Sequence, residues 1–207
     1  MGKALQYLSM GKSVTHFFLF LIVTTSVSLA AIPSGYYDGA SGKSGSTLKS
    51  ALNDIIDGHT EFPYTSSGTD VWDILKVSDR DPNNSSNVIC VYTQYSIDAA
   101  QEYNSGAGWS REHVWAKSHG DFGTATGAGT DIHNLKPEDV SVNSTRNNKD
   151  FDEGGTLATD NSPPSGYDGT LDCYTTSTTW EPPDGVKGDV ARIIFYPMGL
   201  YHVHSLS

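Results

Sequence analysis

The fold is decided by a stretch that begins with Trp-Ser-Arg-Glu-His-Val-Trp at residues 109–115 and continues with Asp-Ile-His-Asn-Leu-Lys-Pro at residues 131–137 and Val-Asn-Ser-Thr-Arg-Asn-Asn at residues 142–148. In the first two runs, β-branched and aromatic residues alternate with polar ones, which predicts two short strands. Pro137 suits a first helical position and no glycine interrupts residues 138–150, so a helix is predicted there. Strand, strand and helix in this order would bring Glu112, His113 and Asn143 to one point.

The side chains at this point suit a metal ion and a base. Glu112 offers a carboxylate and Asn143 an amide carbonyl oxygen, and two oxygen donors completed by water suit Mg²⁺. His113 can accept a proton near neutral pH. Because Glu112 and His113 are neighbours on a strand, their side chains start on opposite faces. A bend or twist of the strand is therefore required before both can serve one site.

These motifs resemble those of the bacterial endonuclease I family, which comprises secreted or periplasmic nucleases of the ββα-metal (His-Me) finger class. The resemblance rests on the three runs above and on Trp-Glu-Pro-Pro-Asp-Gly-Val-Lys-Gly-Asp-Val-Ala-Arg at residues 180–192, in the family's order. It extends from about Tyr36 to Tyr196. It implies that residues 31–207 form one α+β domain: a small mixed sheet with flanking helices that contains a ββα-metal finger.

The resemblance also implies roles for the three site residues. His113 is expected to be the general base that removes a proton from the attacking water. Glu112 and Asn143 are expected to hold Mg²⁺, with Mn²⁺ or Ca²⁺ as substitutes, and this single metal would stabilise charge on the scissile phosphate and the leaving 3′ oxygen. The products would carry 5′-phosphate and 3′-hydroxyl ends. A base with an ordinary histidine pKa would lose activity below about pH 6.5.

Five further residues are expected to assist this site. Arg146 and Asn148 match the family's Arg-x-Asn pattern, which makes Arg146 a phosphate contact and Asn148 a supporting residue; a helix-surface salt bridge is the alternative for Arg146. Arg192 is a hypothetical contact for the phosphate, because the loop at residues 119–129 has no arginine; a structural ion-pair network is its alternative. His133 and Asn134 should face opposite sides of their strand, where one of them supports His113.

The two ends of the chain differ from the rest. Two lysines precede an apolar run at residues 14–23, and Ser-Leu-Ala at residues 28–30 is typical of a cleavage site, so residues 1–30 are expected to be a secretory signal peptide. The apolar run is short for the alternative, an uncleaved membrane anchor. A secreted or periplasmic monomer without stable membrane association is expected. Beyond about residue 197 the family likeness stops, so the C-terminus is expected to be truncated or divergent.

The charge of the chain opposes a wide nucleic-acid-binding surface. Removal of residues 1–30 takes away two lysines and no acid, so the remaining charge is 11 − 24 = −13. Affinity for nucleic acid rests largely on Lys and Arg that neutralise phosphates. Weak, salt-sensitive binding of DNA, with RNA as a further substrate, is therefore expected. A local basic groove could draw on the seven basic residues of the motif-bearing half: Arg111, Lys117, Lys136, Arg146, Lys149, Lys187 and Arg192.

Four other elements and the two cysteines complete the sequence-based expectations. Apolar residues at helical spacing predict a core-facing helix at residues 48–56, a short helix at residues 70–77 and a helix from Pro183 onward, and a continuous apolar run predicts a buried strand at residues 87–92. Cys90 lies in that strand, and Cys173 is its one potential partner. A disulfide and a pair of free thiols are equally consistent with this spacing.

Three functions are compatible with these observations. The favoured one is a Mg²⁺-dependent, largely sequence-nonspecific endonuclease that hydrolyses phosphodiester bonds. A secreted binding domain that kept the fold and lost activity would fit the acidic charge and the divergent C-terminus. A secreted zinc hydrolase would use Glu112, His113 and His133, but the chain lacks the His-x₃-His helical pair that is usual in zinc sites.

Overall fold

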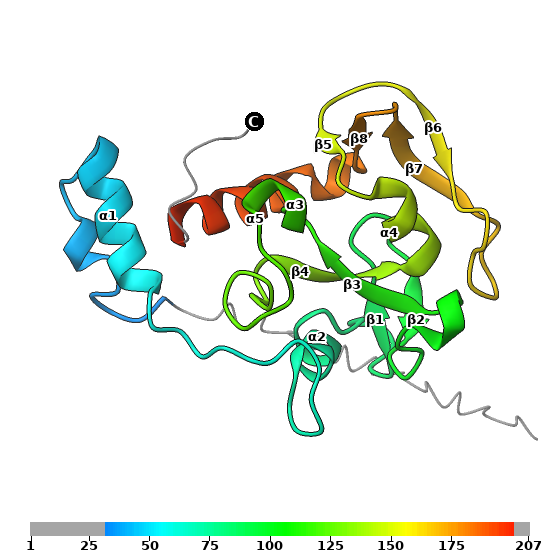
Figure 1. Ribbon diagram of the computed structural model, residues 1–207, viewed down its shortest axis with the longest axis horizontal. Helices are drawn as coiled ribbons and strands as arrows, with labels where there is room; N and C mark the ends of the chain where they lie inside the picture. The colour runs from blue at the N-terminus through cyan, green and yellow to red at the C-terminus, as the bar shows by residue number, and fades with distance from the viewer. Residues whose placement is uncertain (1–31, 201–207) are drawn as a thin grey trace, which may run out of the picture. The chain divides into compact units, whose positions relative to one another are not determined.

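A computed structural model describes residues 32–200 (Figure 1). The expected signal peptide at residues 1–30 and the C-terminal residues 201–207 lie outside this range. All elements within it belong to one compact unit that starts at Gly35. They follow in the order η1 (Asp38–Ala40), α1 (Gly45–Ile56), α2 (Val71–Ser78), β1 (Asn87–Ile89), β2 (Ser96–Asp98), η2 (Asn104–Gly106), β3 (Trp109–His113), α3 (Lys117–Gly120), β4 (Leu135–Asp139), α4 (Val140–Arg146), β5 (Asp150–Phe151), β6 (Thr156–Thr159), β7 (Thr170–Thr175), β8 (Thr179–Glu181) and α5 (Asp184–Leu200).

The strands form three small sheets within the described range, rather than the one mixed sheet expected. β1 pairs with β2 and β3 pairs with β4, both antiparallel, and the third sheet has the order β5-β8-β7-β6. Only this third sheet is mixed, because β5 runs parallel to β8. The fold therefore combines helices with small sheets, as an α+β protein does.

The boundaries of β4 and α4 differ from the prediction. Residues 131–134 form a turn, because the Asp131 side chain accepts a hydrogen bond from the His133 amide at 2.8 Å. The strand consequently runs to Asp139 and includes Pro137, which was expected to begin the helix. Asp139 caps α4 by accepting hydrogen bonds from the next two free amides. The helix ends at Arg146 because Asn147 adopts a φ of +54°. Strand, strand and helix are nevertheless consecutive.

The core surrounds the β3–β4 pair. Trp109 and Leu135 from this pair, Leu75 from α2, Val88 from β1 and Trp180 from β8 are fully buried in one cluster. α2 matches the predicted short helix, and its N-cap Asp70 forms a capping box with Asp73 that satisfies the first free amides. The strand predicted at residues 87–92 stops at Ile89 and continues as a turn.

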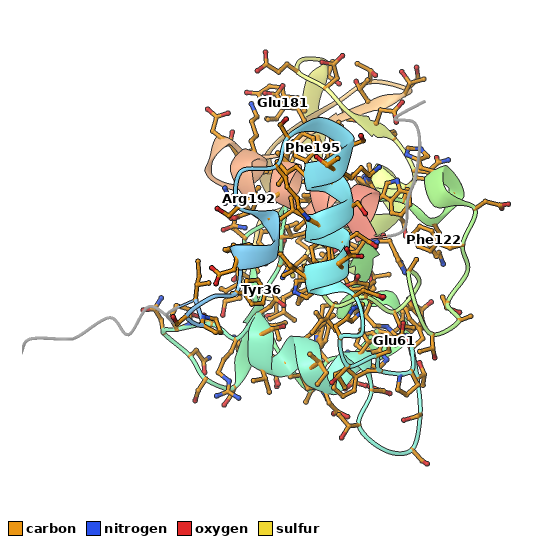
Figure 2. The ribbon with its side chains drawn as sticks, turned by 90° about the vertical axis from the view of Figure 1, so that its left-hand side faces the viewer. Tyr36, Glu61, Phe122, Glu181, Arg192 and Phe195 are labelled. Carbon is orange, nitrogen blue, oxygen red and sulfur yellow. The ribbon has the colours of Figure 1, made fainter. Side chains whose placement is uncertain are left out.

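α1 and α5 lie at the edge of this core. α1 was expected to face the core, but only Ala51 of its apolar residues is buried, and the helix packs on α5, where Asn53 Nδ2 donates to the Gly199 carbonyl at 3.3 Å (Figures 1 and 2). α5 begins at Asp184, one residue after the predicted Pro183, and continues through Pro197 to Leu200. Within residues 32–200, we find no helix whose length and apolar character would let it span a membrane.

Candidate active site

Glu112 lies buried on the face of β3 that packs against α4. Only 2% of the residue is exposed. Its Oε1 accepts hydrogen bonds from the Tyr92 hydroxyl at 2.8 Å and from Arg146 Nη1 at 2.9 Å. Burial raises the pKa of Glu112, and the positive charge of Arg146 acts in the opposite direction. The carboxylate is therefore oriented by two partners that both contact the same oxygen.

Asn143 lies on the same side of β3 as Glu112. Its Nδ2 donates to Ser110 Oγ at 3.0 Å. Ser110 and Glu112 are two residues apart on the strand and therefore share a face. No hydrogen bond to a described residue engages Asn143 Oδ1, so this oxygen remains available as a ligand. The structure thus brings an amide oxygen and a carboxylate to one face of β3.

His113 occupies the opposite face of the strand, at its last residue. Its Nε2 lies 3.0 Å from the Gly129 carbonyl oxygen, and its ring stacks on Tyr64 with centroids 5.8 Å apart. A carbonyl can only accept, so Nε2 carries the proton and Nδ1 presents its lone pair. Burial lowers the pKa of His113 to about 4, which is well below the ordinary value assumed from the sequence. The imidazole is consequently neutral, as a base must be.

β3 has no bend that would place Glu112 and His113 on one face. The two residues form a regular ladder with Lys136 and Leu135 of β4. Their side chains contact different surroundings, Arg146 in one case and Gly129 in the other. The requirement for a bend is therefore not met, and any group that contacts both side chains must lie across the strand.

Arg146 lies beneath the end of β3 and is 1% exposed. Besides the bond to Glu112, Nη1 donates to the His113 carbonyl at 2.9 Å and Nη2 to the Val114 carbonyl at 2.7 Å. Its guanidinium carbon lies 4.7 Å from the centroid of the Phe151 ring. The residue thus forms a buried ion pair rather than a helix-surface one. Contact with a phosphate would require it to leave Glu112.

Arg192 and Asn148 also have local partners. Arg192 is exposed on α5 and forms an ion pair with Asp189 one turn earlier. Figure 2 shows Arg192 on the opposite side of the view from Phe122, whose ring contacts His113. Asn148 lies beyond the end of α4 and donates to Ser118 Oγ at 3.1 Å. Neither side chain contacts Glu112, His113 or Asn143.

His133 and Asn134 lie in the turn before β4 and not on a strand. The His133 ring stacks on Tyr196 with centroids 4.3 Å apart, and its Nδ1 lies 3.1 Å from Asp131 Oδ1. Asn134 is 1% exposed and bonds both the amide and the carbonyl of Trp115, at 2.7 and 3.1 Å. Asn134 therefore holds the segment that follows His113, whereas His133 is engaged elsewhere.

The donor set fits Mg²⁺ better than zinc. Glu112 and Asn143 offer hard oxygen atoms, and Mg²⁺ commonly binds through one or two protein ligands while it keeps several waters. Within residues 32–200, no group of three or more His, Cys, Asp and Glu is arranged to hold a metal ion. The zinc alternative needs Glu112, His113 and His133 together, but these three side chains contact Arg146, Gly129 and Asp131 respectively.

Most of the seven basic residues in the motif-bearing half have ion-pair or hydrogen-bond partners. Ion pairs join Lys136 to Asp79, Arg146 to Glu112, Lys187 to Glu181 and Arg192 to Asp189. Lys149 donates to Thr175 Oγ1 at 2.7 Å. The basic groove expected from the sequence is therefore reduced, among the described residues, to a few cations without a carboxylate partner.

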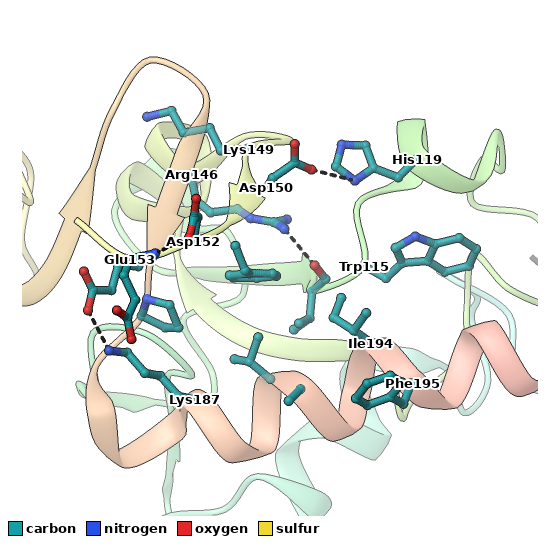
Figure 3. A pocket seen from close by; sticks show the side chains of 16 residues that line it. Trp115, His119, Arg146, Lys149, Asp150, Asp152, Glu153, Lys187, Ile194 and Phe195 are labelled. Atoms are coloured by element: carbon teal, nitrogen blue, oxygen red, sulfur yellow. Dashed lines mark hydrogen bonds and ion pairs between the residues drawn. The ribbon is translucent and has the colours of Figure 1, made fainter. Parts of the chain in front are cut away.

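A cavity of about 570 Å³ lies beside Arg146, between β5 and α5 (Figure 3). Its wall is mainly apolar and includes Trp115, Phe151 and Ile194. Its polar lining is balanced: four carboxylates face His119, Arg146, Lys149 and Lys187, and His119 and Lys187 pair with Asp150 and Glu181. The carboxylates that line it are Asp150, Asp152, Glu153 and Glu181.

Several residues of the site were not found from the sequence. Tyr92 is 20 residues from Glu112, Tyr64 is 49 residues from His113, and the Gly129 carbonyl belongs to a glycine-rich loop. Contacts of this kind depend on tertiary packing and leave no local pattern. Arg111 lies inside the first motif, and its unusual environment was likewise not predictable.

Comparison with known proteins places these residues in a family. The sequence model of the family described as Endonuclease I matches residues 44–206. An extracellular ribonuclease of Bacillus amyloliquefaciens is 54% identical over 161 residues, which are 78% of this chain and 51% of that protein. An extracellular ribonuclease of Bacillus subtilis (strain 168) is 52% identical over the same shares. The chain spans about half the length of these curated relatives.

Proposed function

The chain belongs to the endonuclease I family, and from this premise we propose that it is a secreted, Mg²⁺-dependent endonuclease that cleaves RNA and DNA with little sequence specificity. The observation that carries the proposal is the arrangement around β3. Glu112 and Asn143 present oxygen donors on one face, and the neutral His113 presents Nδ1 at the end of the same strand. We assign β3, β4 and α4 to a ββα-metal finger on this basis.

His113 is the general base in this mechanism. Nδ1 removes a proton from a water molecule, which then attacks the phosphorus in line with the leaving 3′ oxygen. The Gly129 carbonyl holds the Nε2 proton, so it fixes the tautomer and stabilises the imidazolium that forms. The ring of Tyr64 covers one side of the imidazole. The low pKa keeps the base unprotonated over the whole neutral range.

Glu112 and Asn143 are the ligands for Mg²⁺. When bound there, the ion supplies Lewis-acid stabilisation of charge on the phosphate and the leaving oxygen. Arg146 and Tyr92 orient the Glu112 carboxylate through Oε1, and Ser110 orients the Asn143 amide. The ligand pair and the base lie on opposite faces of β3. The scissile phosphate must therefore reach past the strand to contact groups from both faces.

RNA and secretion enter the proposal through the relatives. Both curated relatives are named extracellular ribonuclease. The leader-like composition of residues 1–30 supports export independently. DNA remains a proposed substrate because the attack on phosphorus by water does not involve the 2′-hydroxyl. Products with 5′-phosphate and 3′-hydroxyl ends follow from departure of the 3′ oxygen.

The test compares cleavage of a supercoiled plasmid and of a long RNA with Mg²⁺ and with EDTA. We expect Mg²⁺-dependent cleavage that falls by about 10²–10⁴-fold in His113→Ala. His59→Ala is the control and should keep the wild-type rate; the His59 ring lies beside the Ile56 carbonyl. Glu112→Gln should abolish the Mg²⁺ response. Absence of cleavage by folded protein would favour the binding domain, and stimulation by zinc alone would favour a zinc hydrolase.

A further inference from the structure

We propose that Arg111 forms a binding subsite for a substrate phosphate on the His113 face of β3, with Tyr64 and Trp72 holding its guanidinium between their rings. The inference rests on the proposed function, since it specifies how that site recognises the phosphodiester backbone. Its ligand is a backbone phosphate next to the scissile bond. Arg146 and Arg192, the two contacts expected from the sequence, are both engaged with carboxylates.

The position of Arg111 follows from strand geometry. Arg111 and His113 are two residues apart on β3, so both side chains project from the same face. Tyr64 contacts both of them: its ring stacks on the His113 imidazole, and the Arg111 guanidinium carbon lies 3.4 Å from its centroid. A phosphate bound to Arg111 would therefore lie beside the base.

The guanidinium is held rigidly by neutral groups. The centroid of a second ring, that of Trp72, lies 4.1 Å from the guanidinium carbon. Nη1 donates to the Tyr64 carbonyl and to Thr65 Oγ1, the latter at 3.1 Å, whereas Nε is buried without a hydrogen-bond partner. Two aromatic faces and a carbonyl stabilise a cation without cancelling its charge. The planar fork is thus oriented before any ligand binds.

Arg111 is one of the few basic residues in this half of the chain that form no ion pair. Within the described residues it has no carboxylate within ion-pair distance, whereas Lys136, Arg146, Lys187 and Arg192 each have one. Asp70 and Glu102 act on its charge without forming an ion pair with it, so the half-buried guanidinium keeps donors that an anionic ligand can engage directly. In an acidic protein, the positive charge of Arg111 beside the base, where Lys117 also acts on His113, gives the substrate backbone a place to bind.

The test measures binding of a fluorescent single-stranded oligonucleotide in EDTA, which separates binding from cleavage. We expect Arg111→Gln to weaken binding about tenfold and to lower the slope of log affinity against log salt by about 0.7, the value for one phosphate on a single strand. Arg111→Lys should keep the slope but bind less tightly, because it retains the charge without the planar fork. Arg80→Ala is the matched control, an exposed arginine that should leave the slope unchanged.

The wild-type protein supplies a second measurement that does not depend on the folding of a variant. Phenylglyoxal modifies accessible arginines, and the oligonucleotide should protect Arg111 while Arg80 remains modified, as mapped by mass spectrometry. Equal salt slopes for Arg111→Gln and wild type, or modification of Arg111 at the same rate with and without oligonucleotide, would overturn the subsite. Absence of Mg²⁺-dependent cleavage with protection intact would contradict the proposed catalysis and leave the subsite standing.

Discussion

Arg146 shows how a single buried side chain can maintain a site without contacting a ligand. It holds the Glu112 carboxylate together with the carbonyls of His113 and Val114, so it fixes the end of β3 from below. Removal of one partner from a buried pair leaves the other charge unpaired and costs about 3–5 kcal/mol. Such a residue affects activity and stability together.

We therefore expect Arg146→Met to lower the free energy of unfolding by about 3–5 kcal/mol, because Glu112 loses its counter-ion. Urea denaturation followed by tryptophan fluorescence measures the loss. Arg192→Met removes an exposed ion pair and should cost less than about 1 kcal/mol. If Arg146→Met lost no more unfolding free energy than Arg192→Met, the buried pair would contribute little to stability. The double variant Arg146→Met with Glu112→Gln should recover part of the stability lost in Arg146→Met.

Glu138 gives the protein a pH dependence of stability. The residue is fully buried, and its carboxyl accepts hydrogen bonds from the backbone amides of Tyr92, Thr93 and Asp139. Burial raises the pKa of Glu138 to about 8, although these amides act in the opposite direction. The folded state consequently holds a proton that the unfolded state releases at lower pH.

Because the pKa of Glu138 is higher in the folded state, its contribution is fully present below the unfolded value and is lost as pH rises through about 8. We expect the free energy of unfolding to fall by a few kcal/mol, as an order of magnitude, between about pH 5 and pH 9. Urea denaturation at several pH values measures this slope. Glu138→Gln cannot titrate, so an unchanged slope in that variant would refute the assignment to Glu138.

At the scale of single residues, the sequence suggested side chains for the chemistry, and their roles remain predictions; it did not suggest their surroundings. Glu112 and Asn143 were expected to share a metal, and the structure places both on one face of β3; their metal-binding role remains a prediction. The burial of Arg146 and the stacking of Arg111 could not be predicted, because both depend on Glu112, Tyr64 and Trp72 arriving from other elements.

At the scale of elements, α4 depends on its cap. The helix has seven residues, which is too short to be stable on its own, and it carries Asn143 and Arg146. Asp139 satisfies the amides of Ser141 and Val142 at 2.8 and 3.2 Å. The same residue ends β4, so it joins the strand to the helix. A change at this position therefore affects the orientation of both site residues on the helix.

We expect Asp139→Ala to lower stability by about 1 kcal/mol, within the range of 0.5–2 for a lost N-cap. Asp139→Asn should lose much less stability, because its amide oxygen can still accept both hydrogen bonds. Burial raises the pKa of the Asp139 carboxyl, that is, it disfavours the charged form, so a neutral amide costs little in this place. Thermal unfolding by circular dichroism distinguishes the two. Equal melting temperatures for Asp139→Ala and Asp139→Asn would show that the Asp139 cap does not stabilise α4.

Sequence patterns predicted the elements with strong periodicity and missed those set by local side chains. α2 and the start of α5 agree with their apolar spacing and capping residues. β4 was displaced because Asp131 forms a turn that the alternating pattern does not reveal. α1 has a helical pattern, but it packs mainly on α5 and η1, and Ala51 is its buried residue. Periodicity therefore identified the helix but not its distance from the core.

At the scale of the whole molecule, stability rests on packing and not on a cross-link. Cys90 and Cys173 are both free and both fully buried, so the disulfide that the sequence allowed is absent from the structure. The Cys173 sulfur lies 3.8 Å from the Tyr92 carbonyl oxygen. Burial raises the pKa of both thiols, which makes them poor nucleophiles in the folded state.

We expect the melting temperature to be the same with and without a reducing agent. In the native protein a thiol reagent should react slowly, and two thiols should become available once the chain is unfolded in urea. A colorimetric thiol assay counts them. Fewer than two thiols in unreduced, unfolded protein would show that a disulfide had formed.

Glu112 and His113 lie on opposite faces of one strand, so the proposed metal ligand and the proposed base are on different sides of the same backbone. Each side has its own supporting residues, Arg146 and Tyr92 for one and Tyr64 and Gly129 for the other. A substitution on one face of the strand can therefore leave the residues on the other face in place. Under the proposed roles, loss of His113 alone would leave the Mg²⁺ ligands in place, and loss of Glu112 alone would leave the phosphate subsite at Arg111. A single substitution would then turn this scaffold into a binding protein without activity.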